Sequence, residues 1–422
     1  MKKYCLILSS SLGSVIEWYD FGLFTLFSPL FSKLFFSGIN TQAAIWATLS
    51  VFTVGVICRP LGALLFGYLG DKYGHGKTLR WSILMIALPT FIIGFLPTYQ
   101  QVGVLAPILL TLVRLWQGIS IGGEYSGNII YLAESAPKNY RATFTAFASM
   151  GANTGILLAA LSGLLMSQLT NENTLAQWGW RVPYIFGGIL SLVIYFSRLN
   201  LSETNIFAQL KQNNLLAKDP VKNVFKYHLS ELLRTIGLVC MGSTFYCFTF
   251  IYLPIFLSQK NNFFSLHQTS ILMSFLLVLM IMLMPLAGLL CDKLGRKPML
   301  LFTSGLIIFG VIPGFICLQY HWLPSVICIL LFFTLASSLE QGATPITIVE
   351  NFPAATRYTG ISLGYNIGNG LIGGTVPLIS EWLMQITQWS VSPAIYIALY
   401  ATITGSVVCF FIPETRGNSL LR

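Results

Sequence analysis

Six ionisable side chains stand inside long apolar runs of this 422-residue chain. They are Glu17, Asp20, Arg59, Arg114, Glu124 and Glu340. A charge among apolar side chains is costly, so each of these residues is a functional candidate. A carboxyl group whose surroundings alternate between apolar groups and an arginine can take up a proton in one setting and release it in the other. The competing interpretation is that the charges only neutralise one another and hold helices together, which weighs most for Arg59 beside Pro60.

The amino-acid composition indicates the class of protein in which these ionisable residues lie. Hydrophobic residues make up 55% of the chain and charged residues 9%, and the mean hydropathy is +0.73. A soluble domain carries roughly 25% charged residues, so a soluble fold is excluded and an all-α integral membrane protein is expected. The eight cysteines and four histidines are scattered without ligand spacing, so no metal site is predicted.

Apolar stretches long enough to cross a bilayer recur along the chain. We expect spans near 6–35, 44–69, 79–98, 104–133, 142–168, 180–199, 232–258, 267–291, 299–319, 324–349, 357–385 and 393–412. With the N-terminus inside, nineteen of the 24 Lys and Arg residues, Arg198 included, fall in cytoplasmic segments. This bias predicts that both termini are cytoplasmic. It also explains the net charge of +10 without a nucleic-acid-binding surface.

A repeated motif divides the chain into two halves. The segment from Gly67 through Asp71 to Gly74 follows the second span, and the segment from Gly288 through Asp292 follows the eighth. The two aspartates are 221 residues apart. We therefore predict six-helix bundles at 1–199 and 232–422, joined by a polar cytoplasmic linker at 200–231. Parallel halves of this kind rock about a central site in transporters, so a transporter is expected.

The ordered motifs resemble the major facilitator superfamily, and within it the metabolite:proton symporter family, over essentially the whole chain. They are Glu17-Trp-Tyr-Asp20-Phe, Arg59-Pro-Leu-Gly62, Arg114-Leu-Trp-Gln117 with Gly123-Glu124-Tyr125, Ala133-Glu134-Ser-Ala-Pro137, Trp178-Gly-Trp-Arg181, Asn351-Phe-Pro353, Arg357-Tyr-Thr-Gly360 and Pro413-Glu-Thr415. The resemblance implies twelve transmembrane helices and loops that latch the inner helix ends in the outward-open state. The implied gating residues are Gly67, Asp71, Lys72, Gly74, Glu134, Arg141, Gly288, Asp292 and Arg296. Lys72 and His75 replace basic residues that are usually arginine in the family, and Glu340 stands where the family is normally uncharged.

The remaining roles follow from charge and polarity. Glu17, Asp20, Glu124 and Glu340 are expected to handle protons, with Asp20 or Glu124 as the carrier. Glu340 is either a coupling acid or the partner of a group not yet identified. The expected substrate-binding residues are Trp18, Tyr19, Arg59, Arg114, Gln117, Tyr125, Asn128, Asn153, Tyr365 and Asn366, with Arg114 as an anchor for a carboxylate. Aromatic rings can enclose a quaternary ammonium, although ordinary packing explains any single ring equally well. Glycines at 118, 122, 123, 127, 151 and 155 are expected where helices pack closely.

The predicted function is proton-coupled uptake of a small zwitterion or organic acid, with proline- and betaine-like solutes favoured. A di- or tricarboxylate symporter is the alternative, because Arg59 and Arg114 could supply two cations. A membrane enzyme or a non-transporting sensor are alternatives from other classes. The expected partners are a small-molecule substrate, protons and the lipid bilayer, with no nucleic acid and no cofactor. We expect a monomer in the cytoplasmic (inner) membrane of a bacterium.

Overall fold

The computed structural model describes residues 2–260, 264–320 and 322–421, and this part of the chain is built of helices joined by short turns. The first half contains α1 (Lys2–Phe35), α2 (Thr41–Ile57), α3 (Arg59–Tyr73), α4 (His75–Ile93), α5 (Tyr99–Val102), α6 (Leu105–Ile121), α7 (Glu124–Ser135), α8 (Arg141–Leu169), α9 (Glu172–Thr174) and α10 (Arg181–Arg198). Two helices follow in the predicted linker, α11 (Asn205–Gln212) and α12 (Pro220–Tyr227). The second half contains α13 (Leu229–Cys247), α14 (Leu253–Ile255), α15 (Leu266–Leu294), α16 (Arg296–Leu318), α17 (Leu323–Asn351), α18 (Arg357–Tyr365), α19 (Val376–Thr387) and α20 (Ser392–Phe411). Short π- or 3-10-helical turns occupy Lys138–Tyr140, Leu175–Gly179, Phe248–Tyr252, Phe256–Lys260, Ala354–Thr356, Asn366–Ile372 and Gly373–Thr375.

The helices coincide with the segments that hydropathy predicts. Each predicted span is helical, and most helix ends lie within a few residues of the prediction. In the described chain, ten helical runs are long and apolar enough to cross a membrane. The predicted spans at 6–35 and 357–385 are helical but are not among these ten. The second of them is interrupted by a π-helical stretch, Asn366–Ile372, which contains two glycines.

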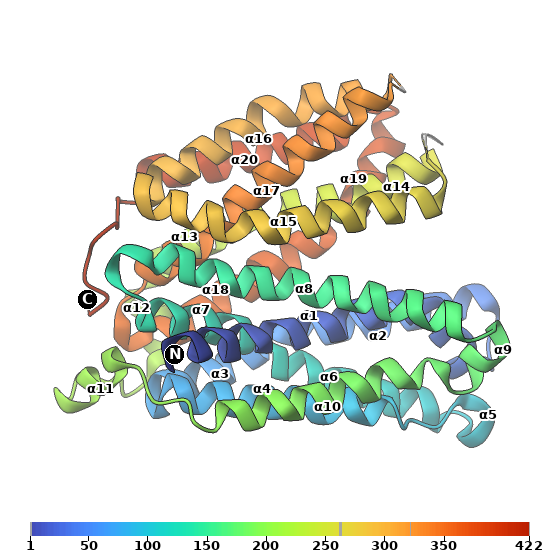
Figure 1. Ribbon diagram of the computed structural model, residues 1–422, viewed down its shortest axis with the longest axis horizontal. Helices are drawn as coiled ribbons and strands as arrows, with labels where there is room; N and C mark the ends of the chain where they lie inside the picture. Colours follow the sequence, from blue (N-terminus) through green and yellow to red (C-terminus); the bar gives the residue numbers. More distant parts are fainter. Residues whose placement is uncertain (1, 261–263, 321, 422) are drawn as a thin grey trace.

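The helices form two groups, and in Figure 1 those of the first half are the lower, blue-to-green set and most of those of the second half are the upper, yellow-to-red set, while α18 of the second half lies among the lower helices. α1 to α10 make up the first group, and α13 to α20 make up the second. Both termini, α11 and α12 lie at one end of the molecule, called the inner end below, whereas α5 and α9 lie at the opposite end. The two groups meet mainly where α8 lies against α15 and where α3 lies against α18.

Two long helical runs of the first half are broken, and each break begins a new helix with an ionisable residue. The first break is at Cys58, where Pro60 at the start of α3 cannot donate a backbone hydrogen bond. The second break is at Gly122 and Gly123. Arg59 is consequently the first residue of α3, and Glu124 is the first residue of α7. A carboxylate is favoured at the positive N-terminal end of a helix, so the second break supplies a suitable position for Glu124.

Glycines allow α1 and α8 to approach closely over several turns. A methyl group added to Gly151 would meet the backbone carbonyl of Ser11, and one added to Gly155 would meet that of Val15. Small residues at such crossings allow backbones to pack directly in membrane proteins. α1 carries Glu17 and Asp20, so this contact fixes how deeply the two acids lie beside the rest of the first half.

Replacing Gly155 with Ala is expected to destabilise the protein, because the added methyl group forces α1 away from α8. The free energy of unfolding should fall by about 1–3 kcal/mol, the usual cost of overpacking. Thermal unfolding of the purified protein in detergent measures this change. Gly305→Ala on α16 is the matched control, since no described atom lies within 4 Å of its added methyl group. Equal unfolding midpoints for the two variants would contradict the close contact.

Candidate functional site

A central cavity of about 70 Å³ lies between the two halves. It is lined by Trp18, Tyr125, Ser149, Ala152, Asn153 and Ile156 from the first half, and by Val239, Gly242, Ser243, Tyr246, Glu340, Gln341, Thr344, Pro345, Ile348, Tyr365 and Asn369 from the second. The lining includes four aromatic and three amide side chains, and none of its described residues is an arginine or a lysine.

Aromatic rings from both halves meet in the cavity. The rings of Tyr125 on α7 and Tyr365 on α18 stack with centroids 4.5 Å apart and planes 20° from parallel. Trp18 on α1 and Tyr246 on α13 add two further rings to the lining. The indole Nε1 of Trp18 is buried and has no hydrogen-bond acceptor among the described residues. A ligand that carries an acceptor would satisfy this donor.

Amide and hydroxyl groups complete the wall on the side of α8. The Asn153 Nδ2 donates to the Ser149 carbonyl over 2.9 Å and to the Gln341 Oε1 over 3.2 Å, so it bridges the halves. The Asn153 Oδ1 is buried without a donor in the described chain. The hydroxyls of Tyr125 and Ser149 are 2.9 Å apart and share a hydrogen bond. Sequence reasoning did not select Ser149 or Gln341, because uncharged polar residues are common in such helices.

Glu340 on α17 is the acid that faces this cavity. Its side chain is buried, and the Thr344 hydroxyl one turn later donates to its Oε1. Gly242 on α13 makes room for the carboxyl group, because a methyl group at that position would collide with it. Glu340 forms no ion pair within 4.0 Å among the described residues.

Asp20 and Arg114 form a buried ion pair inside the first half. The Arg114 Nη1 lies 3.0 Å from the Asp20 Oδ2. The Thr90 hydroxyl and the Gln117 amide donate to the other carboxylate oxygen over 3.0 and 2.8 Å. The guanidinium of Arg114 also lies 3.7 Å from the ring centroid of Phe24. Arg114 and Gln117 are therefore engaged with Asp20 and do not line the central cavity.

Glu124 has a cationic partner that the sequence did not reveal. The Arg198 Nη2 lies 2.7 Å from the Glu124 Oε1, and both side chains are fully buried. The Ser82 hydroxyl donates to the other oxygen of Glu124. Arg198 also donates to the backbone carbonyls of Ser9, Ser10 and Leu79. The prediction counted Arg198 among the charges of the inner surface, but it folds back into the helix bundle.

Glu17 and Arg59 lie buried near each other without direct pairing. In the described part of the chain neither forms an ion pair within 4.0 Å. The Glu17 Oε2 is buried without a hydrogen bond. The guanidinium of Arg59 is 5.2 Å from the ring centroid of Phe21. Neither residue lines the central cavity.

Three other residues predicted to bind substrate serve helix packing in this structure. The Tyr19 hydroxyl donates to the Pro183 carbonyl over 3.0 Å. Asn128 exchanges hydrogen bonds with Ser10 and Ser14 on α1. The Asn366 amide crosses between the halves and donates to the Gly122 carbonyl over 2.8 Å. The cavity thus contains Trp18, Tyr125, Asn153, Glu340 and Tyr365 from the predicted set, and not these three.

At the inner end, two aspartates bind helix N-termini of the opposite half. Asp71 on α3 accepts the backbone N–H groups of Tyr358 and Thr359, both at 2.9 Å, from the start of α18. Asp292 on α15 accepts the N–H groups of Ala142 and Thr143 at 3.0 and 2.9 Å, from the start of α8. The first amides of a helix lack intrahelical partners and carry positive partial charge, so each aspartate is well matched. Gly67 and Gly288 pack directly on Thr359 and Thr143, which lets the helices meet.

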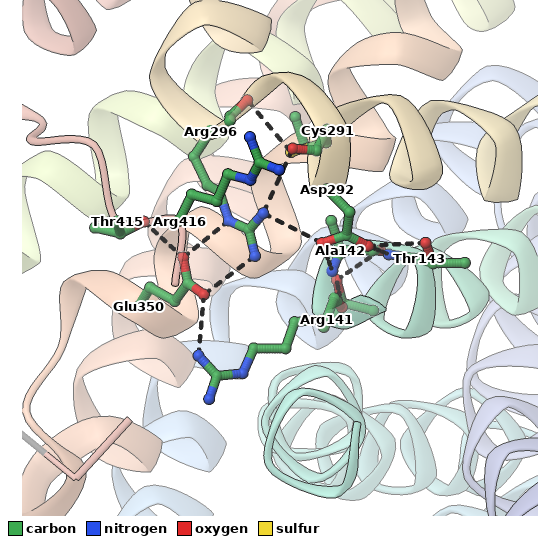
Figure 2. Close-up of polar contacts among 12 residues, drawn as sticks. Arg141, Ala142, Thr143, Cys291, Asp292, Arg296, Glu350, Thr415 and Arg416 are labelled. Carbon is green, nitrogen blue, oxygen red and sulfur yellow. Dashed lines mark hydrogen bonds and ion pairs between the residues drawn. The ribbon is translucent and has the colours of Figure 1, made fainter. Parts of the chain in front are cut away.

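Two crossed ion pairs accompany these contacts. Glu134 on α7 lies 2.8 Å from Arg357 on α18, and Arg141 on α8 lies 3.5 Å from Glu350 on α17. Figure 2 shows Glu350 between Arg141 and Arg296, with Asp292 facing the start of α8. The C-terminal segment joins both pairs, since the carbonyls of Asn418 and Leu420 accept hydrogen bonds from Arg141 and Arg357, respectively. The predicted gating residue Lys72 is exposed and contacts Tyr68 on its own helix, while Gly74 caps α3 with a φ of 120°, which suits glycine.

Comparisons with known proteins agree with this architecture. The sequence profile of the Major Facilitator Superfamily matches residues 11–374 and 264–421. The chain belongs to the Major Facilitator Superfamily. It is 33% identical over 423 residues to the glycine betaine/proline/ectoine/pipecolic acid transporter OusA of Dickeya dadantii, covering 98% of this chain and 84% of that protein. The proline/betaine transporter of Salmonella typhimurium is 32% identical over the same shares of the two chains.

A solved structure of the superfamily has the same fold. The proton:xylose symporter XylE bound to 6-bromo-6-deoxy-D-glucose superposes with a TM-score of 0.78 at 17% identity, over 99% of this chain and 98% of that one. The predicted family and all-helical transporter fold are thus confirmed, and the chain is a multi-pass membrane transporter and not an enzyme. In the described residues no group of three or more His, Cys, Asp or Glu side chains could hold a metal ion.

The two inner contacts of this superfamily member differ at one position of the repeat. Arg296 follows Asp292 by four residues and binds Glu350 through its Nε and Nη2, at 3.0 and 3.2 Å. His75 follows Asp71 by the same spacing and binds Glu134 through its Nδ1 at 3.0 Å. His75 is fully buried. It contacts Glu134 through one ring nitrogen, where Arg296 contacts Glu350 through two nitrogens of its guanidinium.

Asp71→Asn and Asp292→Asn are expected to loosen the inner end. An asparagine side chain has one acceptor oxygen, so one of the two amide donors loses its partner. Backbone hydrogen exchange should become faster in peptides covering 354–362 for Asp71→Asn and 139–146 for Asp292→Asn, measured by mass spectrometry. Asp219→Asn changes an exposed aspartate of the linker in the same way and should leave both peptides unchanged. Unchanged exchange in both variants would show that the aspartates do not hold these helix ends.

Proposed function

We propose that this transporter is a proton-coupled symporter that takes up small zwitterions of the proline and betaine type. The observation that carries the proposal is the full-length similarity to two transporters named for these solutes. A cavity with four aromatic rings, one carboxyl group and no described arginine or lysine supports it, because such walls suit an ammonium group. We further propose twelve spans, cytoplasmic termini, a monomeric state and the inner membrane of a bacterium. No cofactor is proposed, since a proton gradient supplies the energy.

The two halves, 1–199 and 232–422, are proposed to rock about the central cavity. In this structure Asp71 and Asp292 join the halves at the inner end. Release of these contacts would separate α3 from α18 and α8 from α15, opening a path from the cavity to that end. Movement of one half against the other around a fixed site is how such repeats exchange access.

Asp20 and Glu124 are the proposed proton-binding groups. A proton on Asp20 would remove the negative charge that balances Arg114. The Nε and Nη2 of Arg114 form no hydrogen bond among the described residues. Proton binding there would therefore change the forces between α1 and α6. A proton on Glu124 would leave Arg198 with three backbone carbonyl partners. These carbonyls continue to accept hydrogen bonds from the guanidinium, although they do not neutralise its charge.

The cavity disfavours the dicarboxylate alternative. That function required Arg59 and Arg114 to bind two carboxylates. Neither guanidinium lines the cavity, and that of Arg114 is paired with Asp20. A second carboxylate would also lie near Glu340, where like charges repel.

Transport by the purified protein in proteoliposomes tests the proposal. Radiolabelled proline and glycine betaine should accumulate inside when the external pH is made lower than the internal pH. Collapse of the gradient with a protonophore should abolish accumulation and leave passive exchange. Absence of transport across a broad panel of solutes would favour a sensor, and transport that ignores the gradient would overturn proton coupling.

Asp20→Asn and Glu124→Gln are expected to lose gradient-driven accumulation at least about tenfold, because each removes a proposed proton site. Exchange of labelled for unlabelled substrate across the membrane, without a gradient, should continue in at least one of them. Glu172→Gln on the short α9 is the matched control, since it removes an exposed carboxylate. If both buried variants accumulate substrate normally, the two acids serve structure alone.

A further inference from the structure

Glu340 differs from Asp20 and Glu124 in its surroundings, and it differs from Glu17, which is also without an ion pair in the described chain, because it lines the central cavity. Asp20 and Glu124 each lie within 3.0 Å of an arginine. Glu340 has no basic residue within 4.0 Å in the described chain, and its one described hydrogen-bond donor is the Thr344 hydroxyl. A buried carboxyl group keeps its negative charge only when a positive group or several donors balance it, and otherwise it is protonated. No described neighbour of Glu340 therefore supplies a positive group that would balance its negative charge.

The cavity in front of Glu340 has the lining that an ammonium group requires. Tyr125, Tyr365, Trp18 and Tyr246 contribute aromatic rings to the same wall. Rings of this kind attract a quaternary or protonated ammonium through their electron-rich faces, most strongly where water is excluded. The Nε1 of Trp18, which has no acceptor among the described residues, offers a donor at the same cavity for the opposite, anionic end of a zwitterion.

We propose that Glu340 is the residue that selects the substrate by its positive charge, pairing with the ammonium group while the surrounding aromatic rings enclose it. This inference rests on the proposed function and adds to it the chemical group that the second half recognises. The two halves then have different roles. Asp20 and Glu124 of the first half, each paired with an arginine, exchange protons, and Glu340 on α17 of the second half binds the substrate. Gly242 belongs to this subsite, because any larger residue there would displace the Glu340 carboxyl group.

Two ligands of the same shape isolate the effect of the charge. Glycine betaine carries a trimethylammonium group, whereas tert-butylacetate has a carbon atom in place of the nitrogen and is otherwise equal in shape. Binding of each to the purified full-length protein in detergent is measured by isothermal titration calorimetry. The wild type should bind glycine betaine at least about tenfold more tightly than tert-butylacetate, as expected from a charge pair and cation–π contacts. Glu340→Gln should reduce this ratio about tenfold, and Glu340→Asp should keep most of it.

The controls separate charge selection from a folding defect. Glu172→Gln removes an exposed carboxylate and should keep the wild-type ratio. A general loss of structure in Glu340→Gln would weaken both ligands equally and leave the ratio unchanged. An unchanged ratio in a Glu340→Gln protein that binds tert-butylacetate with the wild-type affinity, or a wild type that does not discriminate between the two ligands, overturns the inference.

Transport data distinguish this failure from failure of the proposed function. If the wild type accumulates a zwitterion with the proton gradient while Glu340→Gln keeps the binding ratio, the symporter proposal stands and the role of Glu340 is refuted. If Glu340→Gln keeps the ratio and loses accumulation, Glu340 is a proton-coupling acid, which also refutes substrate selection. Glycine betaine binding that depends on Glu340, without proton-driven transport, supports the subsite and overturns the symporter.

Discussion

This conformation depends on one interaction, in which an aspartate of one half binds the first backbone amides of a helix from the other half. Asp71 binds the first amides of α18, and Asp292 binds those of α8. These amides have no acceptor within their own helices, so the aspartates compensate two helix ends at once. The contacts keep the halves together at the inner end.

Buried charge is distributed unequally between the halves. In the first half, Asp20 and Glu124 each have an arginine partner supplied by another helix of that half. In the second half, Glu340 faces the cavity with a hydroxyl as its described donor. Protonation of Glu124 leaves Arg198 with its carbonyl partners, whereas an acid without an ion pair, such as Glu340, is open to a ligand. A transporter that couples a proton to a solute can thus bind the proton and the solute at separate acids.

The internal repeat predicts more of the inner end than the two aspartates. Glu134 and Glu350 are 216 residues apart, as are Arg141 and Arg357, and the structure joins them as crossed ion pairs. Glu350 was not selected from the sequence, although its spacing before Pro353 equals that of Glu134 before Pro137. The repeat also aligns His75 with Arg296, so it identifies the position where the two contacts differ.

The sequence by itself determined the helices, the internal repeat and the residues with unusual charge, because hydropathy and spacing depend on the local chain. Only the tertiary structure decided which charges meet. Arg198 is the last residue of an apolar run. The local sequence there is the same whether its side chain points to the inner surface or into the helix bundle. The carbonyls of Ser9, Ser10 and Leu79 and the carboxylate of Glu124 turn it inward, and they come from α1, α4 and α7. Rotation of each helix about its axis is set by such neighbours, which is why Arg114 lies on Asp20 while Glu340 faces the cavity.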